Sequence, residues 1–331
     1  MMADPRVLVV LLNYRTPQMT LRAAQSALAD MPAEAELVIV DNASGDGSMV
    51  IFERAASEWN LGARLRLVQS DRNGGFGAGC NIGLAQRMSD GSAPDFYYLL
   101  NSDAFPDPGC IRTLLDHLGR HPEAGFAASH VRGEDGVPHT TAFRFPSIAG
   151  EFEGAMRLGP VSRLLRHAIV APPLPTGPTQ VDWVAGASVM IRAATLDEIG
   201  TFDETFFLYF EETDLMKRAA RAGWTCWYVP EARVVHIGSV STGMKEWQRM
   251  PAYWFASRRH YFVKTHGRAY AAAAWAARLG GSALHALRCA LTGRRPQDPA
   301  HFTRDLARHG LGLRPGIAGA PPRGTATEDR P

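Results

Sequence analysis

The strongest constraint on the fold comes from the first seventy residues, where three apolar runs alternate with two helical segments. The runs cover Val7–Leu12, Glu36–Val40 and Arg64–Val68. Between them lie the predicted helices Met19–Ala29 and Met49–Trp59. Continuous apolar runs rich in β-branched residues are typical of strands buried on both faces of a parallel sheet. The order therefore predicts an α/β protein with a doubly wound, mostly parallel sheet flanked by helices.

Polar residues follow each of these strands. Asn13 and Tyr14 come after the first strand, Asp41 after the second and Arg72 after the third. Ligands of doubly wound sheets bind beyond the carboxyl ends of the strands. A carboxylate there, as at Asp41, either begins a turn or accepts a nucleobase N–H or a ribose hydroxyl, and the position alone does not separate the two readings.

The segment Asn73–Gly83 contains five glycines, among them Gly75, which let the backbone approach a ligand closely. It leads into a predicted helix, Asn81–Met88, whose N-terminus is suited to face an anion. A dinucleotide fingerprint is a poor match, because that motif follows the first strand of its fold and this segment follows the third. The alternative is a glycine-rich turn without function.

A fourth predicted strand, Phe96–Leu100, ends at Asn101-Ser102-Asp103. An acid at this position forms a turn or holds a hard cation between two phosphates. Further along, His236 lies in the last of two predicted strands, Trp224–Val229 and Arg233–Ile237, where a histidine is either packed in the protein or a ligand.

The middle of the chain carries fewer signals. A helix is predicted over Ile111–His121, and residues 130–180 are expected to form loops and short helices. A strand is predicted over Val181–Ile191, where Asp182 and Trp183 precede small residues that leave room for a ligand. A short helix, Thr195–Ile199, should follow it.

Five apolar residues, Phe206–Phe210, run directly into three acids within four residues, Glu211, Glu212 and Asp214. A helix pattern follows and ends at Gly223. Acids at a helix start complement the helix dipole, so they serve as caps in the simplest interpretation. A carboxylate beside an apolar wall also has a raised pKa, which suits a general base.

The last eighty residues differ in composition. Tyr253–His266 is aromatic and basic, and Ala269–Leu291 is rich in alanine and leucine with interspersed Arg and His. Amphipathic helices of this kind pack on a domain or lie at a membrane surface. No apolar stretch reaches the length of a spanning helix. We expect a main domain over residues 1–265, a helical extension over 266–312 and a disordered tail over 313–331.

Taken in order, these motifs resemble the family 2 inverting glycosyltransferases of the GT-A fold, a Rossmann-like architecture, and within them the rhamnosyltransferase-like branch. The resemblance covers roughly residues 6 to 265. It rests on the order and spacing of six motifs: Val9–Tyr14, Val38–Ser48, Asn73–Gly83, Leu99–Asp103, Trp183–Ile191 and Gly200–His236.

The resemblance implies a metal-dependent hexosyltransferase that uses a nucleotide-diphospho-sugar donor and a divalent metal, Mg²⁺ or Mn²⁺. Asp103 matches the metal-binding end of the family's DxD-type motif, with His236 as a second ligand. Glu212 matches the catalytic base, with Glu211 or Asp214 as contenders. The remaining candidates are expected to contact the donor: Asn13, Tyr14, Asp41, Arg72, Asn73, Gly75, Asn81, Asn101 and Trp183.

By the same resemblance, the enzyme moves a sugar, rhamnose in the favoured case, from a dTDP- or UDP-linked donor to a hydroxyl of a glycan or polyprenyl-diphosphate-linked acceptor in surface polysaccharide synthesis. The expected location is the cytoplasm, with peripheral contact at the inner face of the cell membrane. A net charge of +2 argues against nucleic-acid binding, and the four cysteines include no CxxC pair for zinc. The alternatives are a nucleotide-sugar-binding protein without turnover and a sugar nucleotidyltransferase.

Overall fold

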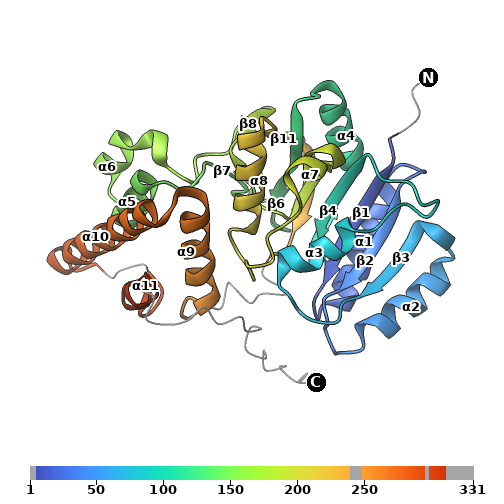
Figure 1. Ribbon diagram of the computed structural model, residues 1–331, viewed down its shortest axis with the longest axis horizontal. Helices are drawn as coiled ribbons and strands as arrows, with labels where there is room; N and C mark the ends of the chain where they lie inside the picture. Colours follow the sequence, from blue (N-terminus) through green and yellow to red (C-terminus); the bar gives the residue numbers. More distant parts are fainter. Residues whose placement is uncertain (1–4, 239–247, 295–297, 311–331) are drawn as a thin grey trace.

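The computed structural model describes residues 5–238, 248–294 and 298–310, and within them a nine-stranded sheet occupies one end of the molecule and a group of helices the other (Figure 1). The strands of the large sheet are β1 Val7–Asn13, β2 Glu36–Asp41, β3 Leu65–Gln69, β4 Phe96–Asn101, β5 Ala104–Pro106, β6 Ala124–Arg132, β8 Thr179–Val181, β10 Ser188–Arg192 and β11 Thr225–His236. A small second sheet pairs β7 Ala142–Phe143 with β9 Trp183–Val184.

Helices cover both faces of the large sheet and form the other end of the molecule (Figure 1). They are α1 Pro17–Asp30, α2 Ser48–Trp59, α3 Phe76–Leu84, α4 Cys110–Arg120, α5 Ile148–Met156, α6 Gly159–Leu164, α7 Ala193–Ile199, α8 Glu211–Ala222, α9 Ala252–His266, α10 Arg268–Thr292 and α11 Phe302–Gly310. Two short 3-10 helices, η1 Gly62–Arg64 and η2 Arg166–Ala168, complete the described elements.

The strand order is β3-β2-β1-β4-β10-β6-β11-β5, with β8 paired to β11. Strands β3, β2, β1 and β4 are parallel, and β6 is parallel to β11. Between these two groups β10 runs antiparallel to both β4 and β6. The prediction of a mostly parallel sheet flanked by helices is confirmed.

Alternating side chains of β1 enter two hydrophobic cores, because successive residues of a strand point to opposite faces of the sheet. Val9 and Leu11 pack in the core that contains α1, α2 and α4. Leu8 and Val10 pack in the core that contains α3, α7 and α8. The uninterrupted apolar pattern of the first strands is therefore the signature of burial on both faces.

Helix α3 begins at Phe76, five residues before the predicted start, because the glycines of this segment serve packing. A Cβ atom on Gly79 would lie 2.5 Å from Leu12, and one on Gly83 would lie 2.3 Å from Val10. Two glycines one helical turn apart thus allow α3 to lie directly on β1. The low helix propensity of glycine concealed this helix in the sequence.

Several strands differ from the predictions, and the short strands β5, β7 and β8 were not predicted at all. The stretch 181–191 is interrupted at Ala185-Gly186-Ala187, which separates β9 from β10. The two strands expected between Trp224 and Ile237 form the single strand β11, whose pairing with β6 shifts register between Val229 and Arg233. Strand β6, in the middle of the sheet, was not predicted, since its Ala124-Gly125 start and further alanines lack a β-branched pattern.

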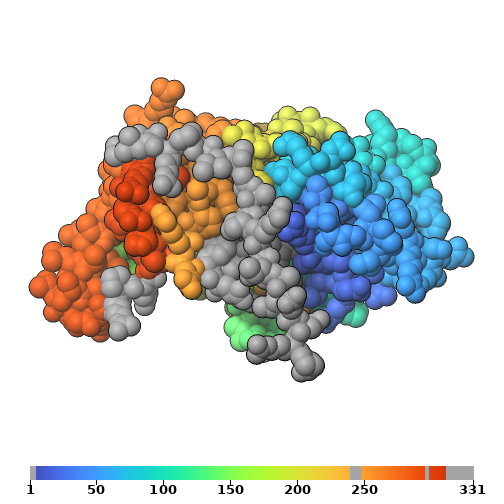
Figure 2. Space-filling view, turned by 90° about the horizontal axis from the view of Figure 1, so that it is seen from below, coloured from blue at the N-terminus to red at the C-terminus, as the bar shows by residue number. Residues whose placement is uncertain are grey.

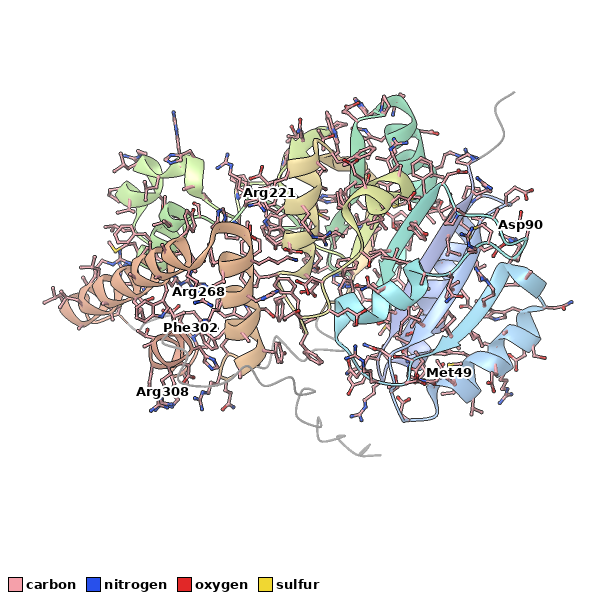
Figure 3. The ribbon with its side chains drawn as sticks, in the orientation of Figure 1. Met49, Asp90, Arg221, Arg268, Phe302 and Arg308 are labelled. Atoms are coloured by element: carbon pink, nitrogen blue, oxygen red, sulfur yellow. The ribbon has the colours of Figure 1, made fainter. Side chains whose placement is uncertain are left out.

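The helical end brings together segments far apart in the chain. Helix α5 packs along α10, and α9 and α11 pack on α10 from other sides. In Figure 3, Phe302 of α11 lies among these helices, in a cluster with Phe255 and Leu306. The expected boundary at residue 265 falls at the end of α9, which belongs to this helical group. The expected disordered tail, 313–331, lies outside the described residues.

Candidate active site

A cavity of about 310 Å³ opens at the carboxyl edge of the parallel strands, a size suited to a small-molecule ligand. Strand ends, the glycine-rich loop and the start of α8 supply its walls. Its lining includes Leu12, Tyr14, Asn42, Asn73, Gly75, Phe76, Asn101, Ser102, Asp103, Ala185, Gly186, Ala187, Phe207, Leu208, Tyr209, Glu211, Glu212, His236 and Tyr253. The sheet therefore gathers in one cavity residues separated by more than two hundred positions in the sequence.

Asp103 and His236 lie next to each other on this cavity. Strand β5 pairs with the end of β11, so that Ala104 is opposite His236. Asp103 Oδ1 lies 3.0 Å from His236 Nε2, and Asp103 Oδ2 accepts the backbone N–H of Gly238 at 3.1 Å. Asn101 Nδ2 lies 3.4 Å from the same ring nitrogen. The pairing of β5 with β11 therefore brings the two predicted metal ligands into contact with each other.

This pair fits a divalent cation that draws its other ligands from a substrate. Within the described residues no group of three or more His, Cys, Asp or Glu side chains could hold a metal ion. A cation here would have one carboxylate and one imidazole from the protein, leaving positions for diphosphate oxygens and water. The imidazole suits Mn²⁺ better than Mg²⁺, which prefers oxygen ligands.

Glu211 and Glu212 begin α8 and also line the cavity. Glu212 Oε1 accepts the backbone N–H of Gly186 at 3.1 Å. Glu211 is only 1% exposed, and its Oε2 atom is buried without a hydrogen-bond partner among the described residues. Burial, together with the charge of Glu212, raises the pKa of Glu211 well above its usual range, and burial also raises the pKa of Glu212.

The turn before these acids has an unusual backbone. Tyr209 and Phe210 have φ angles of 70° and 69°, in the left-handed region that is unfavourable for bulky residues. Helix α9 holds the turn: Tyr209 stacks on Tyr253, and Phe210 contacts Tyr261. Ser257 Oγ donates to the backbone oxygen of Leu208 at 3.0 Å. Helix α9 therefore fixes the residues before the two acids, Phe206–Phe210, which we call the aromatic wall. Held in this way, the wall directs Glu211 and Glu212 toward the cavity.

Gly75 connects the glycine-rich loop to this wall. The N–H of Phe76 donates to the oxygen of Phe207 at 3.1 Å. Gly75 has φ +92°, and a Cβ atom on it would lie 1.8 Å from that oxygen. The glycine-rich loop and the aromatic wall meet at Gly75, and only glycine fits there because no side chain can be accommodated.

Asp41 and Asn13 lie behind the cavity rather than on its lining. Asp41 is 2% exposed, and its carboxylate accepts hydrogen bonds from Asn13 Nδ2 at 2.6 Å and from the Ser44 hydroxyl at 2.5 Å. Gln69 Nε2 donates to the other oxygen at 3.0 Å. Next to Asp41, Asn42 faces the cavity and donates to Asn73 Oδ1 and to the oxygen of Gly75, each at 3.1 Å.

Three further predicted contacts also lie off the lining. Arg72 forms an exposed ion pair with Glu204. Asn81 bonds both the N–H and the oxygen of Phe202, which holds the loop before α8 against α3. Trp183 stacks on Phe143 with ring centroids 4.3 Å apart. Their roles as donor contacts stay predictions, whereas Tyr14, Asn73, Gly75 and Asn101 do line the cavity.

The structure adds lining residues that the sequence did not single out. Asn42 follows Asp41 directly, so its position after the strand was a usable signal. Phe76 stands in the predicted loop, and Gly186 among the small residues after Trp183. Tyr253 comes from the helical end and could not be placed on the cavity without the tertiary structure.

Asp214, the other contender for the base besides Glu211, is engaged elsewhere, and so is the nearby candidate Asp182. Asp214 Oδ2 lies 2.9 Å from Arg218 Nε and 2.8 Å from Lys264 Nζ. Asp182 Oδ2 accepts the N–H of Phe145 at 2.8 Å. Neither residue is part of the cavity lining.

Two family models match this chain. The model described as "Glycosyl transferase family 2" matches residues 7–166, and the one described as "Glycosyl transferase family group 2" matches residues 97–293, more than half of the chain. The chain belongs to the family 2 glycosyltransferases. The predicted family is thereby confirmed, and the matches favour neither a binding protein without turnover nor a nucleotidyltransferase.

Similar curated proteins agree with this assignment. The glycosyltransferase is 29% identical over 249 residues to the N-acetylglucosaminyl-diphospho-decaprenol L-rhamnosyltransferase of Mycobacterium tuberculosis, covering 68% of this chain and 75% of that protein. It is 26% identical to the rhamnosyltransferase WbbL of Escherichia coli, covering 49% of this chain and 60% of that protein. The resemblance to the rhamnosyltransferase-like branch is therefore also supported.

Solved structures confirm the GT-A fold. A mannosyltransferase from Pyrobaculum calidifontis, in complex with GDP-Man and Mn²⁺, matches the glycosyltransferase with a TM-score of 0.57 at 17% identity, covering 94% of this chain and 81% of that one. GalNAc-T7 with UDP, GalNAc and Mn²⁺ matches with a TM-score of 0.58 at 15% identity, covering 92% and 54%.

Proposed function

We propose that this enzyme transfers rhamnose from a nucleotide-diphospho-sugar, dTDP-linked in the favoured case, to a hydroxyl of a polyprenyl-diphosphate-linked glycan, with Glu212 as the base and a divalent cation at Asp103 and His236. The observation that carries the proposal is that the carboxylate pair and the Asp103–His236 pair line one cavity. The names of the two rhamnosyltransferase relatives support the sugar, and the mycobacterial relative supports the lipid-linked acceptor.

The diphosphate end of the donor belongs at Asp103 and His236. When bound, a cation there neutralises the charge that develops on the departing diphosphate. The Mn²⁺ in two structures of the same fold supports this choice. Tyr14, Asn42 and Asn73 line the adjoining part of the cavity and offer hydrogen bonds to the nucleoside.

The two acids differ in a way that supports Glu212 as the base. Because the charge of Glu212 raises the pKa of Glu211, the two carboxylates do not both ionise readily, and one keeps a proton. Glu211 is the deeper of the two and has an unpartnered oxygen, whereas Glu212 accepts the Gly186 N–H, which favours its ionised form. This difference supports Glu212 as the carboxylate that takes the proton.

The reaction is a single displacement. The acceptor oxygen attacks the anomeric carbon while the bond from that carbon to the diphosphate oxygen breaks, and the bonding electrons leave with the nucleoside diphosphate. Glu212 takes the proton of the attacking hydroxyl. Because attack comes from the face opposite the leaving group, the configuration at the anomeric carbon inverts.

The decisive experiment compares Glu212→Gln with Glu211→Gln. Glutamine keeps the volume of the side chain but cannot take the proton, so Glu212→Gln should lower kcat by about 10²–10⁴-fold with donor affinity unchanged. Transfer is measured with radiolabelled dTDP-rhamnose and a polyprenyl-diphosphate-linked acceptor, and donor binding by calorimetry. Near wild-type transfer by Glu212→Gln together with loss in Glu211→Gln would move the role to Glu211.

The metal assignment has its own test. Asp103→Ala should abolish transfer and remove the increase in donor affinity that Mn²⁺ produces, because the cation loses its carboxylate ligand. Calorimetric titration of the donor with and without Mn²⁺ measures this. Asp107→Ala, which lies on the other side of β5 and outside the cavity, is the control. A variant at Asp103 that keeps the full Mn²⁺ effect rules out this site.

A further inference from the structure

Helix α10 presents an apolar face to the outside of the molecule. Its buried residues, Ala274, Gly281, Ser282, His285 and Cys289, face the other helices. The outer face consists of small and apolar side chains over most of its length: Ala272, Ala273, Ala276, Gly280, Ala283, Leu284, Ala286, Leu287, Ala290 and Leu291 are exposed. A surface helix in water normally has the opposite arrangement, with its polar residues outside.

The charged residues in the body of α10 are turned inward. Arg278 Nη1 lies 3.9 Å from Glu151 Oε2 of α5. Arg288 Nη2 donates to the backbone oxygen of Arg157 at 2.9 Å. Both guanidinium groups thus lie on the side of α10 that faces α5 and the residue after it. Neither of them covers the outer face of α10.

Three leucines make this face a marked patch. Leu284, Leu287 and Leu291 are 47%, 57% and 79% exposed. They stand at positions i, i+3 and i+7, so they form one stripe. They account for half of the six large hydrophobic side chains that are exposed in the described part of the chain. Such a concentration marks an interaction surface.

The charge of the surrounding surface favours one kind of partner. Residues 248–294 contain no Asp or Glu but eight Arg and Lys. Arg249, Arg258, Lys264 and Arg278 are paired with carboxylates of other segments. Arg259, Arg268 and Arg294 are exposed and carry the positive charge of this surface. A second copy of the chain would bring like charges together. An anionic lipid surface satisfies both the leucine stripe and the excess of cations.

We propose that the outer face of α10 lies on the surface of an anionic bilayer, with its leucines in the interface and the exposed Arg268 and Arg294 at its two ends near the headgroups. The helix lies on the membrane, since no described helix is both long and apolar enough to cross it. The aromatic residues of α9, which were also candidates for such contact, are instead packed inside: Tyr253, Phe255, Tyr261 and Phe262 are buried.

This surface is joined to the active site. Helix α10 follows α9 after the single residue Gly267, and α9 supplies Tyr253 to the cavity lining. The C-terminal half of α10 reaches one end of the molecule, and α2 lies near the other (Figures 1 and 2). The inference depends on neither the sugar nor the metal proposed above.

Vesicle sedimentation of the full-length protein tests the proposal. We expect binding to vesicles that contain phosphatidylglycerol and much weaker binding to pure phosphatidylcholine. Raising the salt to about 1 M should weaken binding, because the Debye length falls to about 3 Å. The double variant Leu287→Glu, Leu291→Glu should lower the partition coefficient at least about tenfold, since two interfacial leucines are lost.

Val50→Glu is the matched control, because Val50 is 68% exposed on α2, away from α10. It should bind vesicles like the wild type, and unchanged thermal unfolding shows that the leucine variant is folded. Failure of the wild type to bind anionic vesicles overturns the proposal, as does unchanged binding by a folded leucine variant. A dimer that the leucine variant converts to a monomer, without vesicle binding, assigns the face to a second copy instead.

Discussion

Glu211 and Glu212 are adjacent in the chain but differ in how far each carboxylate is removed from water. Both line the cavity, but Glu211 is only 1% exposed, whereas Glu212 is half-buried and accepts the backbone N–H of Gly186. Because burial penalises the charged form, the folded protein favours protonated Glu211 more than the unfolded chain does. The pair therefore links the stability of the fold to pH.

Glu211→Gln should stabilise the protein increasingly as the pH rises. The folded pKa of Glu211 is raised, so the wild type is most stable below the unfolded pKa and loses stability as the pH rises toward the folded value. A glutamine does not titrate, so the difference in Tm between variant and wild type should grow from pH 4 to pH 8. Thermal unfolding across this range measures it. Glu58→Gln, on the surface of α2, should show little such trend, and a constant difference for Glu211→Gln would contradict the assignment.

Gly75→Ala should impair both folding and catalysis, because the new methyl group meets the carbonyl of Phe207. Displacing the loop or the aromatic wall by about 1 Å is sufficient to lower kcat/KM by about 10²-fold. Gly91→Ala is a matched control: its φ is +84°, but nothing lies within 4 Å of its Cβ position. Kinetics and Tm of the two variants separate crowding at the site from backbone strain, and equal losses would show that strain alone matters.

At the level of residues, the sequence predicted the acids and polar groups but not their orientation. The run of Phe206–Glu212 indicated a walled carboxylate, and the structure contains one. Asp41 illustrates the limit: its place at the end of the second strand was predicted, but its enclosure by Asn13, Ser44 and Gln69 depends on three separate segments. Side-chain direction at a strand end is decided by such tertiary hydrogen bonds, which a pattern of residue types does not contain.

Among the elements, α8 and α9 are held together by ion pairs beside the active site. Lys264 Nζ lies 2.8 Å from both Asp203 Oδ2 and Asp214 Oδ2. His260 Nε2 also lies 3.0 Å from Asp203 Oδ2. Although burial acts in the other direction, the hydrogen bonds from His260 and Lys264 hold the pKa of Asp203 below its usual range. This cluster fixes α9, and with it Tyr253, against the start of α8.

Lys264→Met should lower the free energy of unfolding by about 1–3 kcal/mol, since Asp214 is 2% exposed and loses one of its two cationic partners. Urea unfolding measures the change. Arg259→Met, an exposed residue of the same helix, should change stability by less than about 0.5 kcal/mol. Equal effects of the two substitutions would show that the Lys264 contacts contribute no stability.

The elements that could be predicted best are those whose local pattern and tertiary role agree. Strands β1, β2 and β4 have uninterrupted apolar centres that are buried on both faces, so their ranges were predicted to within a residue. Helix α3 and strand β6 were misjudged because Gly and Ala serve close packing there, against β1 and within the sheet centre. A local pattern reports the propensity of a segment, not the neighbour that it will meet.

The whole molecule consists of two ends, one formed by the large sheet and one formed by helices. The helical end combines segments from the middle and the last part of the chain. Arg258 of α9 is 4% exposed, and its Nη2 atom lies 2.8 Å from Glu151 Oε2 of α5. This buried pair connects segments more than a hundred residues apart. The sequence predicted helices in the last eighty residues, but the choice of α5 as their partner depends on long-range contacts and was not predictable.

The position of β10 has a consequence for the synthesis of the protein on the ribosome. The strands β1 to β4 are complete by Asn101, but β10, which covers the edge of β4, begins only at Ser188. At the usual rate of translation this edge stays without its partner for about ten seconds. An apolar strand with unpaired N–H and C=O groups readily pairs with another chain. The nascent protein is therefore most vulnerable to aggregation in that interval, long before its active site exists.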